Sequence, residues 1–178
     1  MRQADELLIQ YAHYHRDRRN IATHFVGIPL IVFAVGVLLA RARFPLGGME
    51  LSAAWVVAAG ATAWYLTRGQ LVLGAVVSTL TLALVALGHG LADGSTASWL
   101  AWGVGVFVVG WVLQFIGHYY EGRKPAFVDD LIGLLVGPMF VTAEAMFALG
   151  WGRALRARIE EAAGPTHLRS AGQPAGSH

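Results

Sequence analysis

The sequence predicts an all-α fold: a polytopic bundle of transmembrane helices with four full spans and a broken or re-entrant fifth segment. The chain of 178 residues is 56% hydrophobic and only 13% charged, whereas soluble domains carry about 25% charged residues. Its 22 glycines are typical of membrane helices that approach one another closely. The third observation is the spacing of the apolar runs along the chain.

Four apolar runs have a length that suits a membrane helix. They cover residues 25–40, 51–67, 71–91 and 98–117, and each is close to the roughly 20 residues that a membrane helix needs. The connection between the second and third runs is so short that we expect an antiparallel helical hairpin there.

The fifth segment, residues 127–151, is less regular. It opens with Asp129 and Asp130, is interrupted by Gly137 and Pro138, and carries Glu144. A proline within a helix removes a backbone hydrogen bond and kinks the helix. Irregular backbone at membrane depth must be buried in protein, so we expect a broken span or a re-entrant hairpin.

The two ends of the chain differ in character. Residues 4–19 have apolar side chains at helical spacing and predict an amphipathic helix at the membrane surface. The glycine-, proline- and serine-containing tail, residues 164–178, is expected to be disordered. Residues 1–163 are therefore expected to form one integral membrane domain.

The basic residues predict a cytoplasmic N-terminus. With that orientation only Arg41 and Arg43 fall outside, and the positive-inside rule is obeyed. The basic residues inside are then Arg16, Arg18, Arg19, Arg68, Arg123 and Lys124. Such short juxtamembrane clusters indicate topology and no nucleic-acid partner. The chain has no cysteine, which excludes thiolate ligands and a thiol nucleophile.

Three histidines and a glutamate flank apolar runs on this cytoplasmic side. His15 and His24 come at the start of the first run, and His118 and Glu121 at the end of the fourth. His89 ends the third run, at the opposite membrane face. His118 and Glu121 are three residues apart and so share one face of a helix.

Imidazoles and carboxylates clustered at a bilayer boundary indicate a functional site. Three imidazoles without sulfur suit iron, zinc, copper or manganese, with His15, His24 and His118 as ligands. Asn20, Glu121 and Glu144 are the candidate catalytic or ligand-orienting residues. Each histidine taken alone could equally be an amphipathic anchor at the interface, so the residues by themselves leave both interpretations open.

The spacing of these residues resembles a known family. The first motif runs from Tyr11 through His15, Asn20 and His24 to Pro29, and the second from Gln114 through His118 and Glu121 to Pro125. Together they are similar to the 2-hydroxy fatty acid dioxygenases, a family of small polytopic membrane proteins that includes a fungal enzyme of the endoplasmic reticulum.

The resemblance implies an iron(II)-dependent enzyme of fatty-acid α-oxidation. Its partners would be a long-chain 2-hydroxy fatty acid, O2 and membrane lipid, and its product a fatty acid one carbon shorter. It also implies that His15, His24 and His118 hold Fe2+ with Glu121 as the motif carboxylate. The expected location is a bacterial inner membrane or the endoplasmic reticulum, with the site near the cytoplasmic face; a homo-oligomer remains open.

Two alternatives belong to other functional classes. In a zinc-dependent membrane lipid hydrolase, Glu121 would act as general base on a metal-bound water. A small transporter or assembly factor would instead need histidines distributed across the depth of the bilayer.

Overall fold

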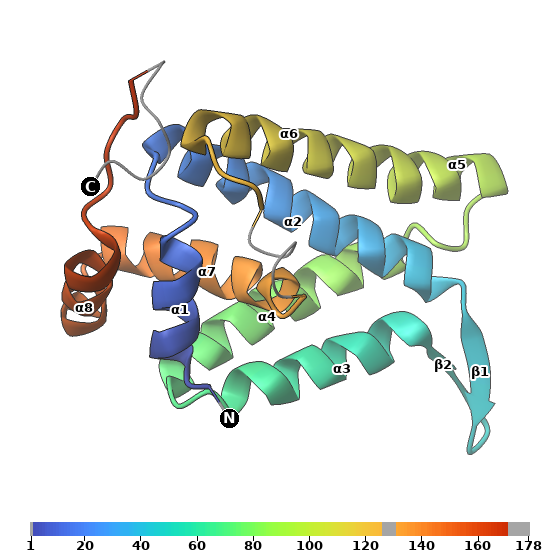
Figure 1. The fold of residues 1–178 in the computed structure, drawn as a ribbon. Helices are drawn as coiled ribbons and strands as arrows, with labels where there is room; N and C mark the ends of the chain where they lie inside the picture. Colours follow the sequence, from blue (N-terminus) through green and yellow to red (C-terminus); the bar gives the residue numbers. More distant parts are fainter. Residues whose placement is uncertain (1, 126–130, 171–178) are drawn as a thin grey trace.

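The computed structural model describes residues 2–125 and 131–170, and its regular structure is almost entirely helical (Figure 1). The elements in chain order are α1 (Ala4–Ala12), α2 (Arg18–Ala40), β1 (Arg43–Leu46), β2 (Met49–Ser52), α3 (Ala53–Leu66), α4 (Leu71–His89), α5 (Thr96–Leu100), η1 (Ala101–Gly105), α6 (Val106–Glu121), α7 (Gly133–Ala148) and α8 (Arg153–Ala163). The helical class is confirmed. A small exposed β-hairpin between α2 and α3 was not expected from the sequence.

Among the described residues, fewer helices than expected have the length and hydropathy of a membrane span. Three helical stretches are long and apolar enough to cross a membrane, namely α2, α4 and the continuous run Thr96–Glu121, and a fourth is obtained if α7 and α8 count as one bent span. The predicted second span contains only the 14 residues of α3. At 1.5 Å per residue α3 is about 21 Å long, shorter than a hydrocarbon core of about 30 Å. It packs beside α4 (Figure 1).

Helix α2 lies at the centre of the molecule and packs against α3, α4, α6 and α7 (Figure 1). Glycines make its closest contacts. A Cβ atom built on Gly27 of α2 would lie 2.9 Å from the carbonyl oxygen of Gly110 on α6, and one built on Gly110 would lie 2.9 Å from the carbonyl oxygen of Gly27. The two backbones therefore touch, as small residues allow in membrane helices.

The break in the fifth segment lies later than the sequence suggested. Helix α7 continues through Pro138, which lies in its second turn and deprives only one early carbonyl of its N–H partner. The chain bends between α7 and α8 by 117°, where Gly150 and Gly152 adopt φ of +86° and +68°. Glycine takes this left-handed conformation without steric cost. Asp129 and Asp130 lie outside the described residues.

The predicted amphipathic helix over residues 4–19 is wrong in its second half. Helix α1 ends at Ala12, and α2 begins at Arg18 with Asp17 as N-cap, whose side chain accepts a hydrogen bond from the backbone N–H of Arg19 at 2.8 Å. The capping carboxylate favours a helix start over a continuous helix. Leu8 in α1 is fully buried, and α1 packs on α7 and α8, so its apolar face contacts protein.

Candidate metal centre

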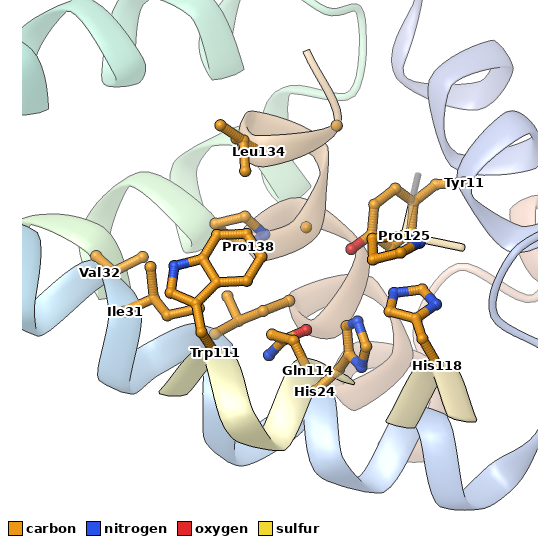
Figure 2. Close-up of a pocket in the computed structure, with 13 residues that line it drawn as sticks. Tyr11, His24, Ile31, Val32, Trp111, Gln114, His118, Pro125, Leu134 and Pro138 are labelled. Carbon is orange, nitrogen blue, oxygen red and sulfur yellow. The ribbon is translucent and has the colours of Figure 1, made fainter. Parts of the chain in front are cut away.

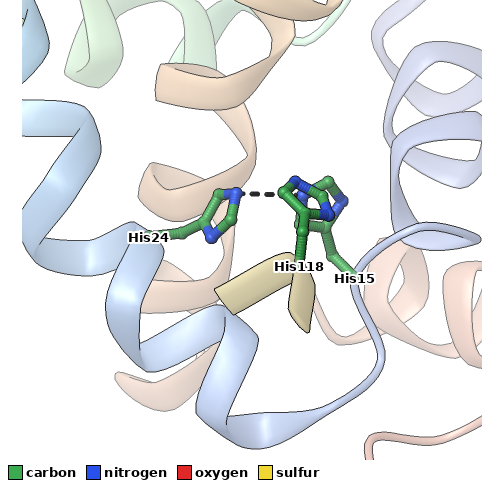
Figure 3. Close-up of side chains that lie close together, drawn as sticks. All are labelled: His15, His24 and His118. Carbon is green, nitrogen blue, oxygen red and sulfur yellow. Dashed lines mark hydrogen bonds between the residues drawn. The ribbon is translucent and has the colours of Figure 1, made fainter. Parts of the chain in front are cut away.

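Three imidazoles meet in the interior beside the N-terminus of α2 (Figure 3). His15 comes from the connection between α1 and α2, His24 from the second turn of α2, and His118 from the last turn of α6. One ring nitrogen from each lies within 4.8 Å of the others. All three side chains are buried, with exposed fractions of 0%, 1% and 6%. Helices remote in sequence thus bring the three predicted ligands together.

Backbone carbonyls fix the orientation of two of the rings. His15 Nδ1 lies 2.8 Å from the carbonyl oxygen of Tyr11, and His24 Nδ1 lies 2.9 Å from that of Asn20. Carbonyl oxygens only accept, so both Nδ1 atoms carry the proton and both Nε2 atoms carry a lone pair. Ligating histidines are commonly held in this way by the second ring nitrogen.

The two Nε2 atoms of His15 and His24 face each other at 3.1 Å (Figure 3). With both lone pairs directed inward, this contact is repulsive unless a cation lies between the rings. His118 adds a buried Nδ1 atom that has no hydrogen-bond partner among the residues that the structure describes. The donor set therefore fits a metal ion with three imidazole ligands and open coordination positions.

The surroundings keep His15 in the neutral form that binds metals. Burial lowers its pKa well below the ordinary value, and positive charge on His24 or His118 would lower it further. One face of the ring is covered by Tyr11, which stacks on it in parallel with centroids 4.0 Å apart. Phe140 of α7 packs against both rings.

Glu121 does not join the three-histidine group among the described residues. The backbone N–H of Arg16 donates to both of its carboxylate oxygens at 3.0 Å, and the N–H of Asp17 donates to Oε2 at 2.9 Å. Asn20 Nδ2 donates to the same Oε2 at 2.9 Å. The carboxylate thus joins the His15 connection and the start of α2 to the end of α6.

Asn20 links three parts of the site without being one of the grouped ligands. Its side-chain amide donates to Glu121 and also to the backbone carbonyl oxygen of Tyr14 at 3.1 Å. The backbone carbonyl oxygen of Asn20 accepts the hydrogen bond from His24 Nδ1. Glu144 on α7 is linked to His15 only through Arg16. Its carboxylate forms an ion pair with Arg16 at 3.4 Å, and Arg16 Nε donates to the backbone carbonyl oxygen of His15 at 2.9 Å.

The beginning of the expected disordered tail is ordered against this site. Within residues 164–170, His167 pairs with Asp17 in a parallel β-bridge, donating its N–H to Arg16 and accepting the N–H of Arg18, both at 2.9 Å. The N–H of Arg169 donates to Asp17 Oδ2 at 2.8 Å. Residues 171–178 lie outside the described residues, and for them disorder stays a prediction. Little in the composition of the tail indicated this contact.

Asp17 is the charged centre of that contact. Burial opposes its ionisation, yet hydrogen bonds from the Arg19 side chain and from the backbone of Arg169 and Arg19 lower its pKa to about 2. It therefore stays ionised at neutral pH and holds the C-terminal segment, residues 164–170, against the His15 connection. The sequence offered one signal for this residue, an aspartate directly before a helix.

A largely apolar cavity of about 60 Å³ adjoins the histidines (Figure 2). It lies between α1, α2, α6 and α7. Its apolar walls include Ile28, Ile31, Val32, Trp111, Leu134 and Pro138, and its polar lining side chains are Tyr11, His24, Gln114 and His118. The site therefore combines a metal-binding donor set with a place for an apolar group. His89 lies elsewhere, at the end of α4 beside Trp55.

Comparison with known proteins identifies a family match and a yeast relative. The sequence model of the family described as 2-hydroxy-palmitic acid dioxygenase Mpo1-like matches residues 1–149. The chain is 30% identical over 154 residues to the 2-hydroxy-palmitic acid dioxygenase MPO1 of Saccharomyces cerevisiae, covering 84% of this chain and 83% of the yeast protein. No solved structure matches. The matched range contains helices α1 to α7 and all three clustered histidines, and the chain belongs to the Mpo1-like family.

Proposed function

We propose that the protein is an iron(II)-dependent dioxygenase that shortens a long-chain 2-hydroxy fatty acid by one carbon. The observation that carries the proposal is the convergence of His15, His24 and His118 beside an apolar cavity, in a chain 30% identical to the yeast enzyme. The balanced reaction converts R–CH(OH)–COOH and O2 to R–COOH, CO2 and H2O. The substrate loses four electrons and O2 gains them.

The three imidazoles would hold the metal, and iron(II) would supply the redox chemistry with O2 that side chains lack. The carbonyls of Tyr11 and Asn20 keep two Nδ1 protons directed away from the centre. Glu121, Asn20 and Arg16 act as positioning residues, because each holds the backbone that carries a ligand. None of them needs to exchange a proton with the substrate for this role.

The cavity would bind the carbons next to the reacting group and keep water from them. A volume of about 60 Å³ holds the head of a fatty acid but not a long acyl chain. The rest of the chain would continue between the helices toward lipid, where exposed apolar side chains such as Phe25, Val112 and Phe115 lie. The substrate's own partitioning explains a site in a membrane protein, which we place near the cytoplasmic face on the distribution of basic residues.

The geometry favours this function over the two alternatives. A zinc hydrolase needs Glu121 beside a metal-bound water and free to accept its proton. Among the described residues Glu121 is not part of the three-histidine group, and its carboxylate already accepts four N–H contacts from Arg16, Asp17 and Asn20. A transport path would need histidines along the bilayer depth. Among the described residues His89 lies apart from the three-histidine group, beside Trp55. The three buried histidines therefore form one cluster, which supports a metal site better than a transport path.

Product analysis with purified protein tests the proposal. With iron(II) and O2, a long 2-hydroxy acid should yield the acid one carbon shorter by mass spectrometry, with one O2 consumed for each product molecule. A chelator should stop the reaction. Retention of zinc with cleavage of a lipid ester in the absence of O2 would contradict the proposal and support the hydrolase.

A further inference from the structure

Gln114 is a buried polar side chain that the metal centre does not use. It lies on α6 one helical turn before His118 and is 5% exposed. Its Nε2 has no hydrogen-bond partner among the described residues. A buried N–H donor is unfavourable without an acceptor, so this amide calls for a partner that is not a protein group of the described chain.

The amide lies in a space that glycine leaves open. A Cβ atom on Gly27 of α2 would lie 2.3 Å from Gln114 Nε2, so any larger residue there would displace the side chain. The close approach of α2 and α6 encloses the amide on one side. The Gln114 side chain also lines the apolar cavity, with Nε2 on the Gly27 side. Rotation of the carboxamide about its last bond exchanges its oxygen and nitrogen, so an acceptor bound in the cavity would be met by turning the N–H toward it.

The cavity has a polar end and an apolar end (Figure 2). His118, His24 and Tyr11 lie toward one end, and Ile31 and Val32 toward the other. Gln114 lies between them, beside Trp111. A matching ligand has an oxygen-bearing head at the histidines, an apolar tail, and an acceptor where the two join.

We propose that the Gln114 carboxamide binds the carboxylate of the fatty acid and so orients its head at the three-histidine centre. This inference rests on the proposed function, since it takes the fatty acid as the ligand. A carboxylate offers two oxygens with about four acceptor positions, so it can accept from the amide while another oxygen faces the histidines. No lysine or arginine is among the residues that line the cavity, which leaves the Gln114 amide and the Tyr11 hydroxyl as donors for an anion outside the histidine group.

Ligand binding separates this role from a general effect on activity. The acid 2-hydroxyoctanoate stays in water and keeps the head group, while octane-1,2-diol keeps the hydroxyl and lacks the carboxylate. Both are titrated into iron-loaded protein by calorimetry. In Gln114→Leu, the Kd of the acid should rise about 10- to 100-fold, as expected for a lost hydrogen bond to a charged group. The Kd of the diol should change less than about threefold.

Gln114→Glu is the second variant, because it keeps the shape of the side chain and places a negative charge against the ligand. Gln114→Glu should raise the Kd of the acid at least as much as Gln114→Leu does and leave the Kd of the diol nearly unchanged. The control is Ser78→Ala, since Ser78 Oγ is also buried without a partner among the described residues but does not line the cavity. It should leave both affinities unchanged.

Three results would overturn the proposal. Equal binding of the acid by wild type and both Gln114 variants would mean that water or nothing meets the amide. Equal weakening of acid and diol would mean that Gln114 only shapes the cavity. A wild-type protein that neither binds nor shortens the 2-hydroxy acid would overturn the proposed function together with this inference.

Discussion

At the scale of single residues, the positions of His15 and His24 depend on contacts with neighbouring residues. Tyr11 and Asn20 hold imidazole protons with their carbonyls, and Glu121 collects N–H groups from the connection that carries His15. Such supporting contacts set how well a metal site is preformed, and their loss commonly weakens metal binding 10- to 100-fold.

Replacing any one of His15, His24 and His118 with alanine should remove most of the bound metal, because each supplies one of three ligand atoms. Metal content per purified protein is measured by plasma mass spectrometry. His89→Ala is the control and should keep its metal, since His89 contacts Trp55 instead. A fully metallated His118→Ala protein would refute the ligand assignment.

Glu121→Gln should weaken metal binding and lower the free energy of unfolding by about 2 kcal/mol, because an N–H group of the new amide would face the backbone N–H donors of Arg16 and Asp17. Both thermal unfolding and metal affinity are measured. Excess iron(II) should restore activity, as expected for a positioning residue. Lost activity in a stable, fully metallated variant would instead indicate direct participation in the reaction.

At the scale of elements, the site depends on how closely α2 and α6 approach and on what holds the His15 connection. A Cβ atom on Gly117 would lie 2.2 Å from Thr23 Oγ1 and 2.4 Å from Asn20 Oδ1. The C-terminal segment, residues 164–170, binds the same connection through contacts of His167 and Arg169 with Asp17. Both features lie within a few residues of a histidine ligand.

Gly117→Ala should separate the two helices and destabilise the protein by roughly 1–3 kcal/mol, as overpacking usually does. Metal affinity should fall with it. Gly105→Ala is the matched control, since a Cβ atom there meets nothing within 4 Å. Thermal unfolding of both variants in the same detergent decides the matter, and equal midpoints would contradict the close packing.

A chain ending after Ala163 should still insert into the membrane but bind metal at least about tenfold more weakly, because the contacts of Arg169 with Asp17 and of His167 with the backbone of Arg16 and Arg18 are gone. A chain ending after Ser170 keeps those contacts and serves as the control. Metal titration of both chains gives the comparison. Unchanged affinity in the shorter chain would show that the C-terminal segment does not support the His15 connection.

At the scale of the whole molecule, basic residues gather at the end that holds the site. The predicted topology places Arg68 and Lys124 on the cytoplasmic side and Asp93 outside. Single cysteines introduced at these positions in the cysteine-free chain can be labelled with an impermeant thiol reagent. The cysteine at position 93 should react from the opposite side, and identical labelling at all three positions would reject the topology.

Much of this architecture could be predicted from the sequence, because apolar length and small residues determine membrane helices almost locally. The clustering of His15, His24 and His118 followed from placing their helix ends on one face. The docking of His167 and the bend at Gly150 and Gly152 could not be predicted. They depend on contacts between distant segments or on left-handed backbone angles that no run of apolar residues reveals.

The order of the ligands along the chain has a consequence for biogenesis. His15 and His24 are synthesised early, His118 follows only with α6, and the C-terminal segment that binds Asp17 comes later still. The nascent protein therefore carries two of the imidazoles without the third until α6 has been made, so the three-histidine group can be completed only after that helix.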